Sequence, residues 1–152
     1  MHEALQITEA SPVDASLLSD IAYRAKQYWG YPDEWMTLWK EDLRVTPHMI
    51  HEHAVWKIMA GESIAGYAII VKLDTGYEVE HCFVAPEFMG KGYGTTLLKY
   101  IFGLDPYRHQ PFTVLSDPHA LRFYEKFGFK TIKQIPSKPE GRTIPLMQMI
   151  NG

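Results

Sequence analysis

The sequence predicts an α/β fold in which a mixed β-sheet carries helices on its faces. Two observations predict it. Segments rich in β-branched and aromatic residues alternate along the chain with segments whose apolar residues recur at helical spacing. Glycine or proline stands at most of the boundaries between them. The expected order is β-α-α-β-β-β-α-β-α-β-β, and we expect one domain that spans residues 1–152.

The chain is expected to open with a strand over residues 4–10 and a helix over residues 11–29. Ser11 can cap this helix, because Pro12 suits a first helical turn and Asp14 stands three residues after the cap. The apolar residues expected to face the core are Leu17, Leu18, Ile21, Ala22 and Ala25.

Gly-Tyr-Pro at residues 30–32 breaks the first helix, and a second helix is expected over residues 33–43. Its front is acidic, which favours a helix N-terminus. The apolar side chains expected on one of its faces are Trp35, Leu38, Trp39 and Leu43.

The middle of the chain is expected to form a run of strands. Gly61 and Glu62 are expected to turn a tight hairpin between strands at residues 51–60 and 62–73. A third strand is expected over residues 77–86, where Pro86 ends it.

The C-terminal part alternates helices with strands. Helices are expected over residues 95–102 and 117–127, the second capped by Asp117 and stopped by Gly128. Strands are expected over residues 111–115, 129–135 and 143–150. Because proline cannot donate to a sheet ladder, Pro145 predicts that the last strand lies at an edge or contains a bulge.

The composition narrows the class of protein. Cys82 is the single cysteine, so no disulfide can form within the chain, which suits a reducing compartment and predicts a cytoplasmic location. The N-terminus does not resemble a signal peptide, and no apolar run has the length of a membrane span. The net charge of -3 argues against nucleic acid as a partner and is compatible with a cationic substrate.

The stretch Met-Gly-Lys-Gly-Tyr-Gly at residues 89–94 lies between an expected strand and an expected helix. Glycines at the start of a helix let backbone N–H groups approach a phosphate, and Lys91 can add a positive charge. The spacing fits neither the dinucleotide-binding pattern G-x-G-x-x-G nor the P-loop pattern. From these six residues alone, a turn without a ligand is an equally good interpretation.

The surrounding residues favour a ligand. The segment EHCFVAPEFMGKGYGTTLLKYI, residues 80–101, resembles motif A of the GNAT superfamily of acetyl-CoA-dependent N-acetyltransferases: a strand ending in V-x-P, then Q/R-x-x-G-x-G/A, then a helix. Met89 stands where the family usually has Gln or Arg. The segment DPHALRFYEKFGF, residues 117–129, resembles motif B, with Asp117 in place of the usual Asn. The matching positions are Ala120, Phe123, Tyr124, Lys126, Gly128 and Phe129.

The resemblance implies a GNAT fold, with a mostly antiparallel sheet of about six to seven strands, about four helices and splayed central strands. It implies acetyl-CoA as the acyl donor, with its pyrophosphate on the glycine loop and its pantetheine arm between the splayed strands. The residues that it places at the cofactor are Phe83, Val84, Met89, Gly90, Lys91, Gly92, Tyr93, Gly94, Thr95, Asp117 and Tyr124.

The resemblance also implies direct attack of an amine on the thioester, with Tyr124 as the general acid for the leaving thiolate. A base is needed because alkylamines are protonated at neutral pH. Glu80 is the first candidate, Glu78 the second, and both are expected on one face of their strand. His81 is expected on the opposite face unless a bulge reverses it. Both glutamates also fit a solvated strand face, and Tyr124 also fits a core position.

The acceptor side is expected near residues 27–35, where Trp29, Tyr31, Asp33 and Glu34 either pack and turn the chain or form a mouth for a cationic or aromatic amine. His51 and His53 alternate on an expected strand, but no further ligand is evident, so no metal site is expected. Cys82 is interpreted as a packing residue.

Four functions remain open. The favoured one is acetylation of a primary amine of a small molecule. A protein N-terminal acetyltransferase is the second, although residues 111–116 lack the acidic residue that such enzymes usually carry there. A non-catalytic acyl-CoA-binding module is the third, and a nucleotide-binding protein the fourth. A homodimer is compatible with the sequence.

Overall fold

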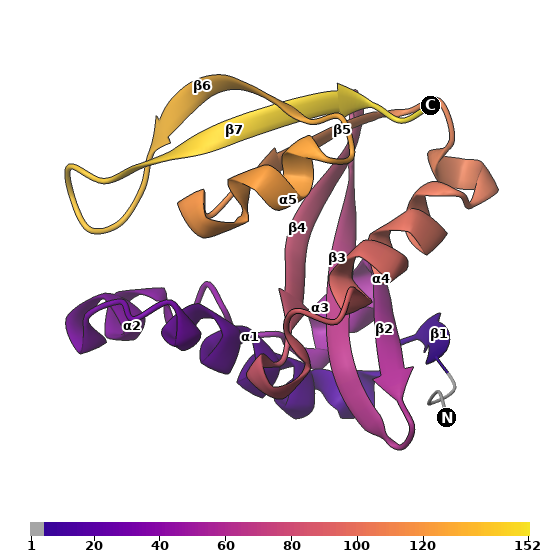
Figure 1. Cartoon of the computed structure of the whole chain (residues 1–152), viewed down its shortest axis with the longest axis horizontal. Helices are drawn as coiled ribbons and strands as arrows, with labels where there is room; N and C mark the ends of the chain where they lie inside the picture. Colours follow the sequence, from indigo (N-terminus) through magenta and orange to yellow (C-terminus); the bar gives the residue numbers. More distant parts are fainter. Residues whose placement is uncertain (1–4) are drawn as a thin grey trace.

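One mixed sheet forms the centre of the structure, a computed structural model that describes residues 5–152 (Figure 1). Seven strands follow the order β1-β2-β3-β4-β5-β7-β6. Their bounds are β1 (Leu5–Glu9), β2 (Ala54–Ala60), β3 (Ser63–Leu73), β4 (Gly76–Val84), β5 (Pro111–Leu115), β6 (Lys130–Pro136) and β7 (Thr143–Ile150). Neighbouring strands are antiparallel except β4 and β5, which are parallel. The predicted mixed, mostly antiparallel α/β fold is confirmed.

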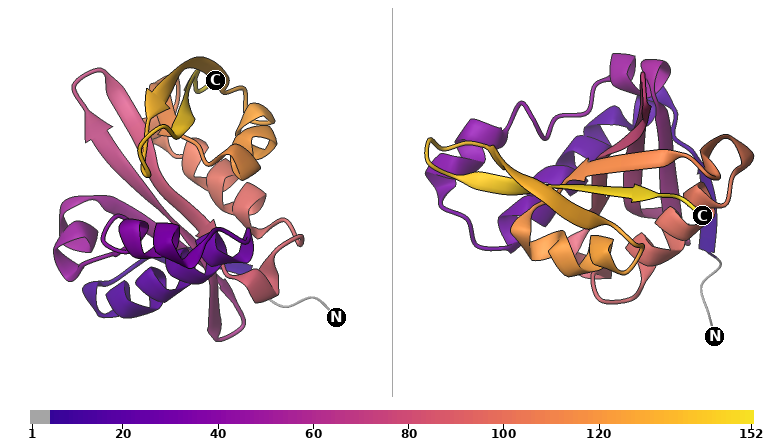
Figure 2. Two further views of the ribbon diagram at one scale, coloured as in Figure 1. Left: turned by 90° about the vertical axis from the view of Figure 1, so that its left-hand side faces the viewer. Right: turned by 90° about the horizontal axis from the view of Figure 1, so that it is seen from above.

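The helices divide between the two faces of the sheet and create two apolar cores (Figure 2). The bounds of the helices are α1 (Ala15–Tyr28), α2 (Asp33–Trp39), α3 (Pro47–Glu52), α4 (Tyr93–Phe102) and α5 (Leu121–Glu125). Side chains of α1, α2 and α3 pack in one core, and those of α4 and α5 pack in the other. None of the helices in residues 5–152 has the length and apolar character needed to cross a lipid bilayer.

The first helix begins as the sequence predicts. The Ser11 amide donates to the Asp14 carboxylate at 2.9 Å, and Pro12 starts a short 3₁₀ turn before α1. The buried stripe of α1 is Leu18, Ile21, Ala22 and Ala25. The inward placement of Leu17 is wrong, since it precedes this stripe by about 100° of helical rotation and is exposed.

The second helix is amphipathic but turns a different set of residues inward. Met36, Trp39 and Leu43 are buried, whereas Leu38 is exposed. The prediction that Leu38 faces the core is therefore wrong, because α2 ends at Trp39 and Met36 lies i−3 from that residue on the inner face.

Helix α3 was not predicted, and it corrects the start of the following strand. Thr46 caps α3 by accepting from the Met49 amide at 3.1 Å, and Pro47 occupies the first turn. Residues 51 and 52 therefore close a helix, and β2 begins only at Ala54. His51 lies in α3 and His53 ends it, so the two histidines do not alternate on a strand.

The hairpin at Gly61 is confirmed, since β2 ends at Ala60, β3 begins at Ser63 and Gly61 has φ +61°. The prediction for Pro145 is wrong, because β7 lies between β5 and β6 and its only register shift is elsewhere. The Pro145 carbonyl accepts from the Ser116 amide at 3.0 Å, just beyond the end of β5. In an antiparallel sheet, the N–H and the C=O of one residue point toward the same neighbouring strand. The N–H that Pro145 lacks would therefore point past the end of β5, where no ladder bond is needed.

Gly76 fixes the point where β4 and β5 meet. It has φ +148°, and a Cβ built on it would lie 2.3 Å from the Pro111 carbonyl oxygen. We expect Gly76→Ala to lower the free energy of unfolding by about 2 kcal/mol, through backbone strain and overlap with β5. Urea denaturation measures this loss.

Gly103→Ala is the matched control, because the nearest atom to its built Cβ lies at 3.5 Å and its φ is -83°. An equal loss of stability in both variants would contradict the role assigned to Gly76.

Candidate active site

The defining feature of the site is the divergence of β4 from β5. The parallel ladder between them has three residue pairs and stops at Val79 and Val114. β4 continues for five more residues, from Glu80 to Val84, while β5 ends at Leu115. Figure 1 shows β5, β7 and β6 turning away from β3 and β4. The backbone edge of β4 beyond Val79 is therefore left without a strand beside it.

The glycine loop leads from this free edge into α4. Gly90 and Gly92 have φ values of +79° and +84°, and a Cβ built on either would have no other atom within 4 Å. The first backbone hydrogen bond at the start of α4 runs from the Thr96 amide to the Gly92 carbonyl, at 3.0 Å. Within residues 5–152, no amide from Gly90 to Thr95 donates a hydrogen bond to the chain. These residues thus suit an anionic group such as a pyrophosphate.

A cavity of about 510 Å³ connects the free edge of β4, the glycine loop and the start of α5. Most residues singled out in the sequence line it: Trp29, Glu80, Phe83, Val84, Met89, Gly90, Gly92, Tyr93, Gly94, Thr95, Asp117 and Tyr124. Six others do not line it, namely Glu78, Tyr31, Lys91, Asp33, Glu34 and His81. Lys91 is exposed, with its ammonium 5.9 Å from the centre of the Phe88 ring.

A β-bulge at Glu80 corrects the expected orientation of His81. Ile69 pairs with His81 and Ile70 pairs with Val79, so Glu80 has no partner on β3. The extra residue returns His81 to the face that carries Glu78. The strand alternation that placed His81 on the opposite face is thus wrong, and the bulge named as the alternative is present.

His81 is buried, and its Nδ1 lies 2.8 Å from the Tyr67 hydroxyl. Burial lowers the pKa of His81 to about 4, although the nearby Asp42 acts in the opposite direction. A neutral imidazole held in the core is a poor proton acceptor. Among the bulge residues, Glu80 is exposed and lines the cavity.

The two glutamates occupy different surroundings. Glu78 is half-buried, and its pKa is raised by burial and by the charge of Glu80. A raised pKa makes the Glu78 carboxylate a stronger base, but of the two glutamates only Glu80 lines the cavity. As the catalytic base, Glu80 is therefore favoured by its position and Glu78 by its raised pKa.

Tyr124 extends from α5 into the same cavity. It is 5 % exposed, and its hydroxyl makes no hydrogen bond within the described part of the chain. The hydroxyl is also not among the fully enclosed polar atoms that lack a partner. Burial raises the pKa of Tyr124 well above 10, so the phenol stays protonated at neutral pH. It is a free proton donor that faces the cavity.

Cys82 lines the cavity beside these groups but is unsuited to nucleophilic chemistry. Burial raises the pKa of its thiol to about 12. The thiolate is the nucleophilic form of cysteine, and almost none exists at neutral pH. This fits the interpretation of Cys82 as a packing residue.

Asp117 is the centre of an ionic cluster that the sequence did not reveal. It caps the turn before α5 by accepting from the His119 amide at 2.8 Å, and it pairs with Lys26. Burial alone would raise its pKa, but the charge of Lys26 and the hydrogen bonds lower the pKa to about 2. The negative charge of Asp117, which stands where motif B usually has Asn, is thus neutralised by Lys26.

Tyr31 belongs to this cluster, since its hydroxyl donates to the Asp117 carboxylate at 2.9 Å. Lys26, His119 and Arg142 complete it from three separate segments. Helical spacing could have placed Lys26 beside Ala22 and Ala25 at the sheet. No local pattern marks Arg142, which reaches the cluster from the β6–β7 connection.

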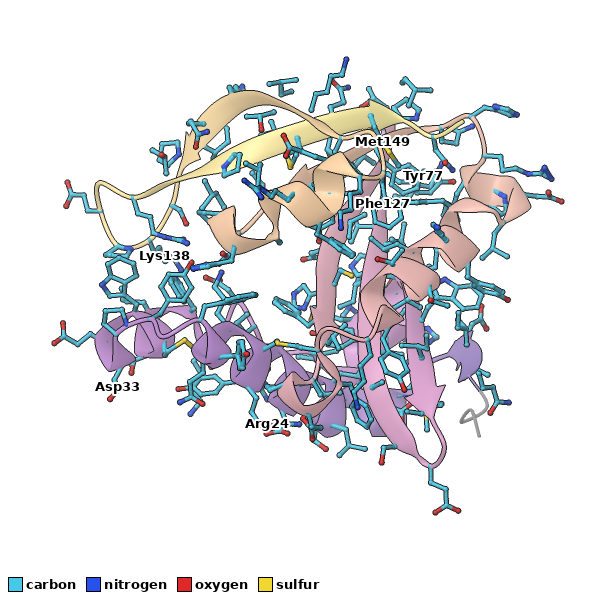
Figure 3. The ribbon with its side chains drawn as sticks, viewed as in Figure 1. Arg24, Asp33, Tyr77, Phe127, Lys138 and Met149 are labelled. Atoms are coloured by element: carbon cyan, nitrogen blue, oxygen red, sulfur yellow. The ribbon has the colours of Figure 1, made fainter. Side chains whose placement is uncertain are left out.

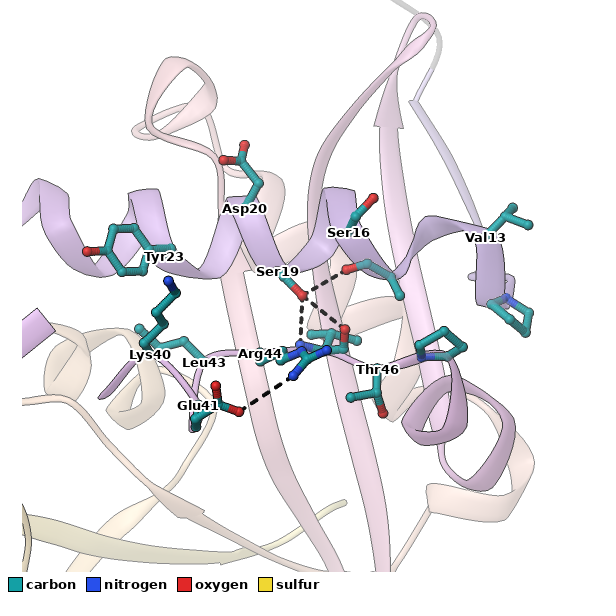
Figure 4. Close-up of a pocket in the computed structure, with 14 residues that line it drawn as sticks. Val13, Ser16, Ser19, Asp20, Tyr23, Lys40, Glu41, Leu43, Arg44 and Thr46 are labelled. Atoms are coloured by element: carbon teal, nitrogen blue, oxygen red, sulfur yellow. Dashed lines mark hydrogen bonds and ion pairs between the residues drawn. The ribbon is translucent and has the colours of Figure 1, made fainter. Parts of the chain in front are cut away.

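A second, larger hollow of about 740 Å³ lies between α1 and residues 40–47 (Figure 4). Its central hydroxyl, on Ser19, donates to the Val45 carbonyl at 3.0 Å and accepts from the Val45 amide at 2.8 Å. These bonds attach the 40–47 segment to α1. The hollow contains none of the candidate catalytic residues, so its size does not make it the site of chemistry.

Comparison with known proteins identifies relatives by family and by fold. The model of the acetyltransferase (GNAT) domain matches residues 31–150. No curated protein matches the chain. Three similar solved structures are the PaiA N-acetyltransferase of Thermoplasma acidophilum in complex with coenzyme A, a GCN5-related N-acetyltransferase of Rhodopseudomonas palustris and the ribosomal-protein-S18-alanine N-acetyltransferase of Escherichia coli.

These structures share the whole fold at low sequence identity. The Thermoplasma protein is 18% identical, with a TM-score of 0.76 over 97% of this chain and 99% of that one. The Rhodopseudomonas protein is 19% identical, with a TM-score of 0.78 over 99% and 96%. The Escherichia protein is 16% identical, with a TM-score of 0.71 over 98% and 95%.

Proposed function

The chain belongs to the GNAT acetyltransferase family with acetyl-CoA as its acyl donor, and from this premise we propose that it acetylates a primary amine of a small molecule. The observation that carries the proposal is the single cavity that joins the unpaired edge of β4, the free amides of the glycine loop and Tyr124. A phosphate site, backbone donors and a proton donor are what acyl transfer from a CoA thioester requires.

The free amides of Gly90 to Thr95 would hold the pyrophosphate of acetyl-CoA. The edge of β4 at Phe83 and Val84 would bind the pantetheine arm and polarise the acetyl carbonyl. When bound, acetyl-CoA supplies the activated acetyl group. The chain's own groups then handle the protons. Glu80 accepts one from the acceptor's ammonium, directly or through water, and the neutral amine that results attacks the thioester carbon. As the C–S bond breaks, Tyr124 donates a hydrogen bond to the departing sulfur and passes to it the second proton, which the nitrogen loses when the amide forms.

One feature supports a small acceptor. The β6–β7 connection lies against α2, where the Trp39 indole donates to the Lys138 carbonyl at 3.1 Å. Figure 3 shows Lys138 above α2 with aromatic side chains between them. This contact closes the gap between the two segments, which leaves less room for an extended peptide than for a small molecule.

Calorimetric titration with acetyl-CoA, CoA, ATP and NAD tests the proposal. We expect micromolar binding of the two CoA forms and no binding of ATP or NAD. Release of CoA thiol is then followed with small amines and with a short peptide. Absence of CoA binding would refute the enzyme, binding without turnover would favour an acyl-CoA-binding module, and turnover of the peptide alone would favour an N-terminal acetyltransferase.

A further inference from the structure

One end of the cavity is closed by the Lys26–Asp117 cluster, which consists of the side chains of Lys26, Tyr31, Asp117, His119 and Arg142. It joins the α1–α2 segment, the turn before α5 and the β6–β7 connection, which are distant in sequence. The Lys26, Asp117 and Arg142 side chains are only 12–14% exposed. Three of the five, Lys26, Asp117 and His119, line the cavity.

The acidic member of the cluster has no accepting capacity left for a ligand. Asp117 Oδ1 accepts from the His119 amide at 2.8 Å and lies 2.9 Å from His119 Nδ1. Asp117 Oδ2 pairs with Lys26 and accepts from the Tyr31 hydroxyl at 2.9 Å, with Arg142 Nη2 at 3.7 Å. A carboxylate offers about four lone-pair sites, so these partners saturate it.

Two side chains at this end can still donate hydrogen bonds. Lys26 has three N–H bonds, and Asp117 is its only hydrogen-bond partner in residues 5–152. Trp29 also lines the cavity, with 42% of its surface exposed, and its indole N–H has no hydrogen-bond partner in that part of the chain. Lys26 and Arg142 carry two positive charges against the one negative charge of Asp117, so these three side chains have a net charge of about +1.

Tyr31, one of the rings expected to attract a cationic amine, and its neighbour Trp39 already hold cations of the chain. Lys26 Nζ lies 4.7 Å from the centre of the Trp39 ring and 5.4 Å from that of Tyr31. The Arg142 guanidinium lies 4.8 Å from the Trp39 ring and 5.4 Å from the Tyr31 ring. The Trp29 ring stacks on His119 at 4.6 Å. A second cation would meet occupied rings and like charge.

We propose that the acceptor carries a carboxylate in addition to its amine, and that Lys26 and the Trp29 indole N–H bind that carboxylate. The acceptor is thus an amino-acid-like amine, whose amino group is directed to Glu80. An end with a net positive charge and available donors favours an anionic oxygen group and disfavours di- and polycationic amines. This inference rests on the proposed function and names the substrate class of the same site.

Matched acceptors test the inference on the unaltered enzyme. An amino acid, its carboxamide and a linear polyamine are compared by kcat/KM in a thiol-release assay. We expect the amino acid to exceed its carboxamide at least 10-fold and the polyamine by more. Preference for the carboxamide or the polyamine would overturn the inference while leaving the acetyltransferase intact. Binding of acetyl-CoA without turnover of any amine would overturn the proposed function and the inference together.

Variants then assign the preference to Lys26. Lys26→Met is expected to raise KM for the amino acid about 10-fold and to abolish the preference over the carboxamide, with KM for acetyl-CoA unchanged. Lys26→Arg is expected to restore the preference, and exposed Lys99→Met on α4 is the control. Should KM for acetyl-CoA rise instead, the donors would serve the cofactor, and the inference would be wrong. If Lys26→Met fails to fold, the acceptor comparison still decides the proposal.

Discussion

Replacing Tyr124 by phenylalanine is expected to lower kcat by about one to two orders of magnitude, with little change in the affinity for acetyl-CoA. The substitution removes only the hydroxyl, which makes no hydrogen bond to the described chain, so packing is retained. Burial raises the pKa of Tyr124 well above 10. The phenol therefore acts chiefly as a hydrogen-bond donor to sulfur as negative charge develops there in the transition state.

Steady-state kinetics combined with calorimetric titration of acetyl-CoA measures the two quantities separately. Tyr100→Phe is the matched control, since Tyr100 lies on α4 with 43% of its surface exposed and does not line the cavity. An unchanged kcat in Tyr124→Phe would remove the catalytic role, and Tyr124 would then be a packing residue of α5.

The fold was largely predictable because its elements are marked locally. Ser11 and Asp14 mark the start of a helix within four residues of sequence. Gly61 and Glu62 mark a hairpin within two. The main omission, α3, has comparable signals in Thr46 and Pro47, but it is only six residues long and carries no apolar period. The position of β7 was mispredicted because strand order depends on pairing between distant segments.

The site was predictable where it follows the backbone and not where it depends on tertiary contact. The glycine loop and the capping role of Asp117 are local features. The bulge at Glu80 changes which side chains of β4 share a face, and the alternation of residues in the sequence does not indicate it. Lys26 and Arg142 meet Asp117 across 91 and 25 residues of sequence, respectively, so only the folded chain reveals the charge at that end of the cavity.

Glu80→Gln is expected to lower kcat/KM at neutral pH by about 100-fold, and the loss should shrink as the pH rises. The variant keeps the shape of the side chain but cannot accept a proton. Its rate then depends on amine that is already neutral, a fraction that increases about tenfold per pH unit below an amine pKa near 10. Profiles of kcat/KM between pH 6 and 10 for the parent and the variant measure the difference.

Glu78→Gln separates the two candidate bases. Burial and the charge of Glu80 raise the pKa of Glu78, so removing the Glu80 charge moves the Glu78 pKa back toward its ordinary value and weakens it as a base. If Glu80 is the base, Glu78→Gln should retain most activity and the profile of the parent. A Glu80→Gln profile that coincides with that of the parent would exclude Glu80. A steep loss confined to Glu78→Gln would assign the base to Glu78, acting through water, since that side chain does not line the cavity.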